Sequence, residues 1–212
     1  MNEQELREVL GEPTELVRKK IADRLNPLTR QFVERSPFVV VATGRPDGGL
    51  DVSPRGDPGG FVRILDERTL IYPEYRGNGV MASMGNIAEN PQVGILMVDF
   101  TRDRIGLHVN GRARILLDEE VRGHHPEIPP DPAPGRRARL WVEVTVQEAY
   151  IHCAKHIPHM QKVPPQQRAA RDWGTDDYRR KGGDFFGAAE QRHSSEHDAG
   201  NPERRTGSWS AG

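Results

Sequence analysis

The chain has 212 residues, which is enough for one sizeable domain with appendages. Its 30 Lys and Arg residues are matched by 31 Asp and Glu residues, so the net charge of −1 argues against a general nucleic-acid binder. A single Cys excludes an internal disulfide and fits a reducing compartment. The N-terminal segment is acidic where a signal peptide would be basic and then apolar, and no apolar run reaches transmembrane length. We therefore expect a cytoplasmic protein with no membrane contact.

Residues 1–35 are expected to form a helical leader. Leu6 and Leu10 lie on one face of a first helix, and apolar residues resume at helical spacing further along the segment. Pro13 and Pro27 interrupt this pattern, because proline removes a backbone donor and disfavours the helical conformation of the residue before it. The sequence thus predicts short helices that pack on one end of the strands that follow.

Residues 36–160 are expected to form the main domain. Apolar and β-branched runs alternate there with Pro, Gly and Asp turns, a pattern typical of antiparallel strands. Short turns and a single inserted helix favour a mainly β fold, a closed barrel rather than a βαβ sheet. Strands are predicted at 38–43, 50–55, 60–65, 69–73, 93–99, 105–116 and 139–150, and the helix at 81–89.

The segment 122–135 is expected to be a loop, because four of the six residues from 129 to 134 are prolines. His124 and His125 lie in this loop as neighbours. No third ligand is found at a suitable spacing, so the pair is interpreted as solvated rather than as a metal site, and no metal is expected.

The composition changes again in the C-terminal extension, residues 161–212. Residues 187–212 are rich in Ser, Gly, His, Glu and Arg, and are expected to be disordered because they lack apolar residues to bury. Trp173, Phe185 and Phe186 are large apolar side chains that are costly to leave in water. The segment 173–186 is therefore expected to dock on the barrel or on a partner subunit.

One loop, residues 72–83, has the chemistry of an anion-binding site. Its two glycines let the backbone approach a ligand, and the helix expected after it can point free N–H groups at an anion. Arg55 precedes a Pro/Gly-rich corner and offers a planar fork that matches two phosphate oxygens. An ordinary turn remains the alternative interpretation of such a loop. The candidate donors of the loop are Arg76, Asn78 and Ser83.

The order of these motifs resembles the pyridoxamine 5′-phosphate oxidase-like family of FMN-binding split β-barrels. The resemblance runs from about residue 37 to residue 156. It is carried by the apolar run at 37–43, by Asp-Val-Ser-Pro-Arg-Gly-Asp-Pro at 51–58 and by Gly-Asn-Gly-Val-Met-Ala-Ser-Met-Gly-Asn-Ile at 77–87. It continues with Leu-His-Val-Asn-Gly-Arg-Ala at 107–113 and Ala-Tyr-Ile-His-Cys-Ala-Lys-His at 149–156.

The resemblance implies a homodimer with two FMN sites built between the subunits. The segment 150–156 would approach the flavin ring, where Lys155 would favour negative charge on the reduced ring. Cys153 in this segment is interpreted as a small buried residue rather than a nucleophile. The residues implied in cofactor binding are Ser53, Arg55, Arg76, Asn78, Ser83, Asn86 and Lys155.

The sequence also departs from the family pattern. Oxidases that act on pyridoxamine phosphate usually carry a Ser-Arg-Lys cluster at the phosphate loop, whereas this chain has Gly79 and Val80 where cations are expected. The C-terminal tail has no recognisable Arg motif for a substrate phosphate. The resemblance therefore argues against pyridoxamine phosphate as the substrate and predicts a reduced affinity for FMN.

Three functions remain open at this point. The first is an FMN-dependent oxidoreductase that acts on a small organic substrate. The second is a non-catalytic flavin or haem binder on the same scaffold. The third is an F420-dependent reductase, for which Lys19, Lys20 and Arg24 could contribute a basic groove, although such residues are also common on solvated helices.

Overall fold

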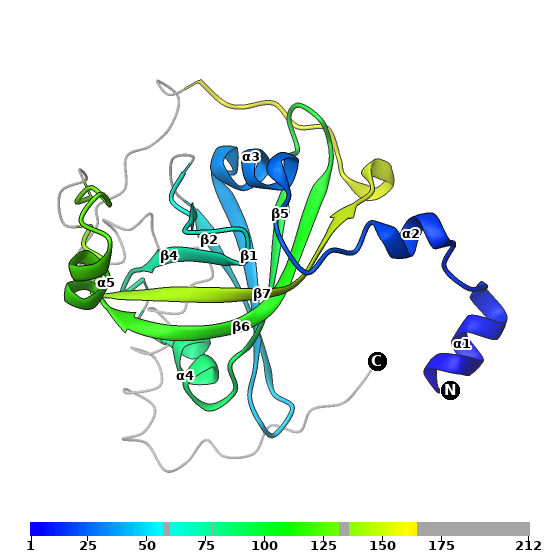
Figure 1. Ribbon diagram of the computed structural model, residues 1–212, viewed down its shortest axis with the longest axis horizontal. Helices are drawn as coiled ribbons and strands as arrows, with labels where there is room; N and C mark the ends of the chain where they lie inside the picture. The colour runs from blue at the N-terminus through cyan, green and yellow to red at the C-terminus, as the bar shows by residue number, and fades with distance from the viewer. Residues whose placement is uncertain (57–59, 78, 132–135, 165–212) are drawn as a thin grey trace, which may run out of the picture. The chain divides into compact units, whose positions relative to one another are not determined.

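The computed structural model describes residues 1–56, 60–77, 79–131 and 136–164, and within them a single sheet organises the fold (Figure 1). The sheet has seven antiparallel strands in the order β2-β1-β5-β6-β7-β4-β3. The mainly β prediction is therefore confirmed. The strands are β1 (Phe38–Gly44), β2 (Leu50–Gly56), β3 (Arg63–Ile64), β4 (Thr69–Glu74), β5 (Gln92–Val98), β6 (Gly106–Leu117) and β7 (Leu140–His152).

The sheet is not closed, which corrects the expectation of a closed barrel. Within the described residues, the edge strands β2 and β3 do not pair with each other. β3 is paired over two residues only, Arg63 and Ile64, so it offers too short an edge for continuous pairing. The strand predicted at 60–65 is accordingly shorter in the structure.

The main core lies on the inner face of the sheet. Strand side chains alternate between the two faces, so every second residue of the long strands is buried. Helix α4 (Ala82–Glu89) adds Met84 and Ile87 to this core, and full burial of such a side chain stabilises the fold by roughly 1.5–3 kcal/mol. The buried strand residues include Val39, Val41, Ile95, Met97, Leu107, Val109, Val144 and Val146.

Strands β6 and β7 pair closely around one glycine. A register shift follows Asn110, and a Cβ atom built on Gly111 would lie 2.2 Å from the carbonyl oxygen of Thr145. A larger residue cannot fit there without moving the backbone of β7. Glycine in a strand interior often marks such a bulge or close approach.

A second, smaller core covers the other face of β4, β6 and β7. It is formed under helix α5 (Asp118–His124), which provides Val121, and it includes Ile71 and Trp141. The interpretation of residues 122–124 as loop is therefore wrong. Three acidic residues in the first turn favour a helix through its dipole, and burial of Val121 stabilises it.

The leader contains α1 (Glu3–Leu10), α2 (Glu15–Lys19) and α3 (Pro27–Arg35). Helix α3 begins where the Asn26 side chain accepts hydrogen bonds from two backbone N–H groups, and it buries Phe32 and Val33. In Figure 1, α3 and α4 lie at opposite ends of the curled sheet, and both add side chains to the main core. Helix α1 has no buried residue. The leader packs on the sheet through α3, through Leu25 in the main core, and through a backbone bridge between Ala22 and Ala149.

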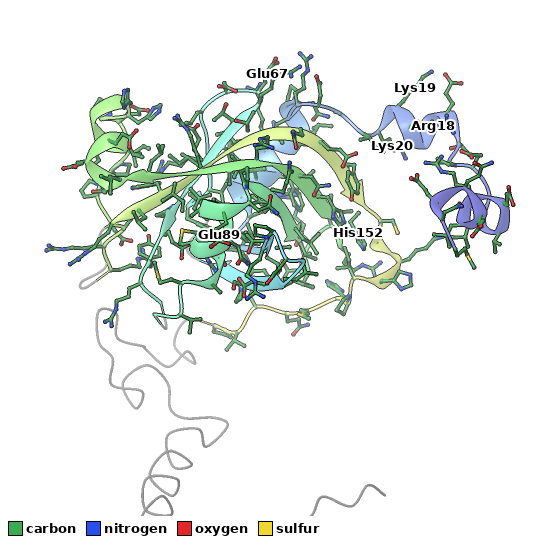
Figure 2. The ribbon with its side chains drawn as sticks, turned by 90° about the horizontal axis from the view of Figure 1, so that it is seen from below. Arg18, Lys19, Lys20, Glu67, Glu89 and His152 are labelled. Atoms are coloured by element: carbon green, nitrogen blue, oxygen red, sulfur yellow. The ribbon has the colours of Figure 1, made fainter. Side chains whose placement is uncertain are left out.

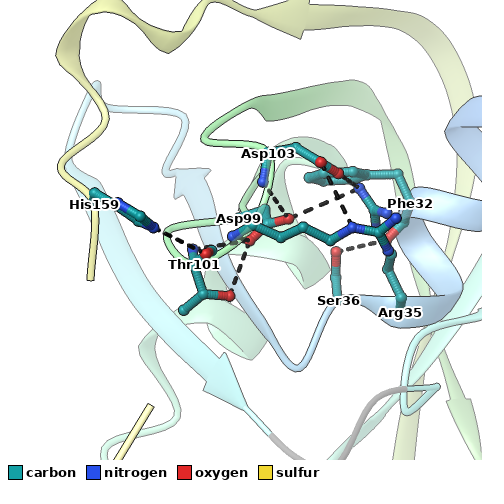
Figure 3. A network of polar contacts seen from close by, with 8 residues as sticks. Phe32, Arg35, Ser36, Asp99, Thr101, Asp103 and His159 are labelled. Atoms are coloured by element: carbon teal, nitrogen blue, oxygen red, sulfur yellow. Dashed lines mark hydrogen bonds and ion pairs between the residues drawn. The ribbon is translucent and has the colours of Figure 1, made fainter. Parts of the chain in front are cut away.

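A polar network fixes α3 to the turn between β5 and β6 (Figure 3). The Asp99 carboxylate accepts hydrogen bonds from the backbone N–H groups of Thr101, Arg102 and Asp103. Arg35 donates to Asp103 over 2.6 Å, which links the helix to the turn. A carboxylate that accepts several backbone donors holds a turn in one conformation.

The described residues contain no helix long and apolar enough to cross a membrane. The segment 173–186, which was expected to dock, and the segment 187–212, which was expected to be disordered, lie outside the described residues. Both expectations remain predictions.

Candidate functional site

Strand β2 brings polar side chains to the inner side of the sheet edge. Because side chains alternate along a strand, Asp51, Ser53 and Arg55 point to one face, while Leu50 and Val52 point to the other and are exposed. The three polar residues are half-buried, since helix α4 lies beside β2. Arg55 and its neighbours on β4 and α4 form a cluster, called here the β2–α4 corner: Asp51, Ser53, Arg55, Glu74 and Ser83.

Arg55 is the centre of the corner. Its Nε donates to Oε2 of Glu74 over 2.9 Å, and its Nη2 donates to Oγ of Ser83 over 3.2 Å. Its Nη1 donates to the carbonyl oxygen of Pro54 over 3.0 Å. The Arg55 and Glu74 side chains are only 17% and 8% exposed, so their ion pair is largely shielded from water.

Asp51 collects the hydroxyl groups of the corner. Its Oδ2 accepts from Ser53 over 2.8 Å and from Ser83 over 2.7 Å. The corner therefore contains one guanidinium and two carboxylates, and both hydroxyl donors point to one carboxylate oxygen. Its formal charge is negative.

Burial shifts the pKa of two titratable groups of β4, Glu74 and Tyr72. Desolvation raises the pKa of Glu74 above its ordinary value, and Arg55 opposes this shift. Burial also raises the pKa of Tyr72, helped by the negative charge of Glu74. The Tyr72 hydroxyl has no hydrogen-bond partner among the described residues, although the side chain is fully buried.

The N-terminus of α4 opens beside the corner. The residue before the helix, Met81, has a left-handed conformation with φ of 58° and makes no side-chain cap hydrogen bond among the described residues. Gly77 and Gly79 in the preceding loop also have positive φ, of 56° and 80°. Glycine adopts this conformation at no steric cost, so the loop can turn tightly and present backbone N–H groups to an anion.

The structure brings three of the seven candidate cofactor residues together: Ser53, Arg55 and Ser83 meet in the β2–α4 corner. Asn86 is buried one helical turn further on and donates to Oγ1 of Thr43. Arg76 is exposed in the loop before α4, and Asn78 lies outside the described residues.

Lys155 is not brought to the corner within one chain. Glu74 pairs with Leu140 at the start of β7, whereas Lys155 follows the opposite end of that 13-residue strand, in the 3-10 helix η1 (Ala154–His156). Its expected position near the flavin ring, contributed by a second subunit, stays a prediction. Cys153, interpreted from sequence as buried, is exposed, because β7 ends at His152 and the chain leaves the sheet there.

A cavity of about 770 Å³ lies on the other side of β4. The strand alternates, so Pro73 and Tyr75, the neighbours of Glu74, line this cavity. Trp141 forms part of its wall and donates its ring N–H to Asp118 over 2.7 Å. The size suits a small organic ligand.

The cavity is rich in arginine. Arg136 and Asp131 form a shielded ion pair, and Asp131 also accepts a hydrogen bond from the Tyr75 hydroxyl. Arg63 lines the cavity half-buried and makes no ion pair within the part of the chain that the structure describes. The sequence did not predict this cavity, because its lining comes from segments far apart in the chain: β3, β4, α5 and the start of β7. The one sequence feature that pointed to it was Trp141, a large apolar residue on the polar side of a predicted strand.

A ring cluster lies on the outer face of the sheet. His108 stacks on Tyr150 with ring centroids 4.6 Å apart, and Nε2 of His108 is 3.1 Å from Nδ1 of His152. Burial and His152 lower the pKa of His108. Figure 2 labels His152, at the end of β7. The sequence did not single out this cluster.

No curated protein matches the chain. Among solved structures, the chain is similar to HupZ of Group A Streptococcus (17% identity, TM-score 0.45, 64% of this chain and 98% of that one). It is also similar to an F420 reductase (20% identity, TM-score 0.40, 57% of this chain and 94% of that one). A further similar structure is that of a putative pyridoxamine 5′-phosphate oxidase from Listeria innocua (15% identity, TM-score 0.40, 57% of this chain and 92% of that one).

The family model described as pyridoxamine 5′-phosphate oxidase matches residues 25–153. This segment contains the whole sheet, helix α4 and the β2–α4 corner. The match spans more than half of the chain, and the resemblance inferred from the sequence motifs is confirmed. The chain belongs to the pyridoxamine 5′-phosphate oxidase family.

Proposed function

We propose that this protein is an FMN-dependent oxidoreductase that transfers hydride or electrons to or from a small organic substrate. The observation that carries the proposal is the meeting of Arg55, Ser53 and Ser83 at the open N-terminus of α4, in a chain of this family. Guanidinium, hydroxyl and helix N-terminal N–H groups are the donors that proteins use for phosphate.

The donor chemistry of the corner fits a flavin phosphate. A guanidinium has five N–H donors, and Arg55 uses three of them in the protein, which leaves two for an external anion. Ser53 and Ser83 would add hydroxyl donors once their hydrogen bonds to the Asp51 carboxylate are broken. The exposed Arg76 and the first backbone N–H groups of α4 would provide the remaining contacts to the phosphate.

The cavity behind β4 would hold the substrate. A bound flavin supplies the two-electron chemistry, and the protein binds, orients and shields the reacting groups. Arg63 would bind an anionic group of the substrate, because it lines the cavity without a carboxylate partner among the described residues. Trp141 and Tyr75 would exclude water from one wall.

We further propose a cytoplasmic homodimer. Five side chains, one from each neighbouring strand, form a row across the outer face of the sheet that is partly apolar and partly exposed. A row that combines apolar and aromatic side chains in this way is typical of a protein–protein contact. The members of this outer row are Pro54, Val40, Leu96, His108 and Tyr150.

The first experiment is to identify the compound that co-purifies with the protein, by absorbance and mass. Flavin absorbance bands and the mass of FMN are the expected result. A Soret band would instead indicate haem, and a deazaflavin mass would indicate F420. For the F420 alternative, two of the three candidate cations are already paired within the protein: Lys19 with Glu15, and Arg24 with Asp23 and Glu67.

The second experiment is the Arg55→Ala substitution, measured by fluorescence titration with FMN. Loss of a charge-assisted contact to phosphate should weaken FMN binding by about 1.5–3 kcal/mol. Riboflavin lacks the phosphate, so its affinity should not change. Arg114→Ala, which removes a Glu143 partner on the exposed part of β6, is the matched control.

Because Arg55→Ala leaves Glu74 buried without its partner, the unfolding midpoint of the variant is measured in parallel. An unchanged FMN affinity in a folded Arg55→Ala protein would remove Arg55 from the site.

A further inference from the structure

The charge of the β2–α4 corner is unusual for a phosphate site. FMN carries a phosphate of nearly two negative charges at neutral pH. The corner has one cation, Arg55, against the carboxylates of Asp51 and Glu74. An anion that enters it meets a negative cluster rather than a positive one.

Each carboxylate also occupies donors that a phosphate would use. Glu74 takes the Nε–H of Arg55 over 2.9 Å, and its 8% exposure means that little water screens the interaction. Asp51 takes both hydroxyl donors, from Ser53 and Ser83, on a single oxygen. The arrangement resembles a phosphate site in which the protein's own acids already receive the hydrogen bonds.

Neither carboxylate is explained by packing alone. Ser83 is 3% exposed and Glu74 is 8% exposed, so the network lies at the edge of the core, where apolar side chains would cost less to bury. Tyr72, the nearest other titratable group of β4, gives Glu74 no hydrogen bond. The acids therefore interact with the anion-binding donors themselves.

We infer that Asp51 and Glu74 are specificity-determining residues that compete with a phosphate group for Arg55, Ser53 and Ser83, and so keep the FMN phosphate loosely bound. The inference rests on the proposed flavin site and concerns its relative affinity for FMN and riboflavin. The site discriminates weakly between FMN and riboflavin, and removal of either carboxylate charge increases that discrimination.

The test uses the full chain and the conservative substitutions Asp51→Asn and Glu74→Gln. Each amide keeps an oxygen that accepts hydrogen bonds and removes one negative charge. Dissociation constants for FMN and for riboflavin are measured by flavin fluorescence. Each variant should bind FMN about tenfold more tightly, which corresponds to about 1.4 kcal/mol for removal of one repulsive charge, and should bind riboflavin as before.

Glu143→Gln is the matched control, because Glu143 also pairs with an arginine, Arg114, but on the strand pair β6–β7 outside the corner. It should change neither constant. Unfolding midpoints are recorded for all variants. If Glu74→Gln does not fold, Asp51→Asn alone decides, since Asp51 is half-buried at the strand edge.

The outcomes separate this inference from the proposed function. If the wild type binds FMN and the variants bind it equally or more weakly, the acids position the donors, and the inference is overturned while the function stands. If the wild type fails to bind FMN but the variants bind it, the inference holds and the proposed function is lost. If none of the proteins binds FMN, both are overturned.

Discussion

At the scale of single residues, the buried surroundings of Glu74 contain one unsatisfied group. The Tyr72 hydroxyl is fully buried and has no partner among the described residues, so its desolvation is not compensated. Tyr72→Phe removes this hydroxyl and keeps the ring that packs in the main core. We expect the free energy of unfolding in urea to rise by about 1 kcal/mol.

The matched change is Tyr150→Phe, whose ring lies half-buried on the outer face. It should leave the free energy of unfolding nearly unchanged. A Tyr72→Phe protein that is less stable than the wild type would show that the hydroxyl has a partner in solution, such as a buried water.

Single residues also show where sequence reasoning stops. Arg55 and Ser83 were predicted to act together, because guanidinium and hydroxyl groups next to a glycine loop have a recognisable chemistry, and the structure places them 3.2 Å apart. Glu74 was not predicted. It lies 19 residues from Arg55 along the chain, on β4, which does not pair with β2, so the two side chains meet only because the whole sheet curls. A contact between unpaired strands leaves no local mark in the sequence.

At the scale of elements, the pairing of β6 with β7 depends on Gly111. A Cβ atom at this position would overlap the Thr145 carbonyl oxygen, so Gly111→Ala must separate the two strands. We expect a loss of about 3 kcal/mol in the free energy of unfolding, measured by denaturant titration.

Gly85→Ala gives the contrasting result. Gly85 lies inside α4 with no atom within 4 Å of a built Cβ, and alanine has the higher helix propensity. This variant should gain about 0.5–1 kcal/mol. Equal losses in both glycine variants would mean that the strand contact is not the cause.

The elements were predicted unequally for a physical reason. The long strands were predicted to within two residues, because alternate positions of β7 bury Val142, Val144 and Val146. Helix α5 was missed: it has seven residues and one buried side chain, Val121, so it has no helical repeat to recognise. Its stability comes from packing on Trp141 and Ile71, which are distant in the sequence.

At the scale of the whole molecule, the outer row is the surface on which the proposed dimer depends. Val52 lies on the same face, in register with Ala42, and is 64% exposed. Val52→Asp would place a charge in an apolar interface, where its desolvation is costly. We expect the wild type to sediment as a dimer and this variant to shift towards monomer.

Leu28→Asp is the control, because Leu28 is an even more exposed apolar side chain (76%) but lies on α3, away from the outer row. It should sediment like the wild type. A wild-type protein that sediments as a monomer with FMN bound would contradict the dimer and the expected contribution of Lys155 from a second subunit.

The main core and the α5 core lie on opposite faces of the same two strands, β4 and β7. β4 and the first half of β7 have the main core on one face and the α5 core on the other, so the floor of the cavity is held from both sides. The rim is built differently, from α5 and the proline-rich connection to β7. Insertions or deletions in that connection can therefore reshape the mouth of the cavity while the strands beneath it keep their register. With the substrate in this cavity as proposed, changes to the rim alone would alter which substrate fits while the strands and both cores stay as they are.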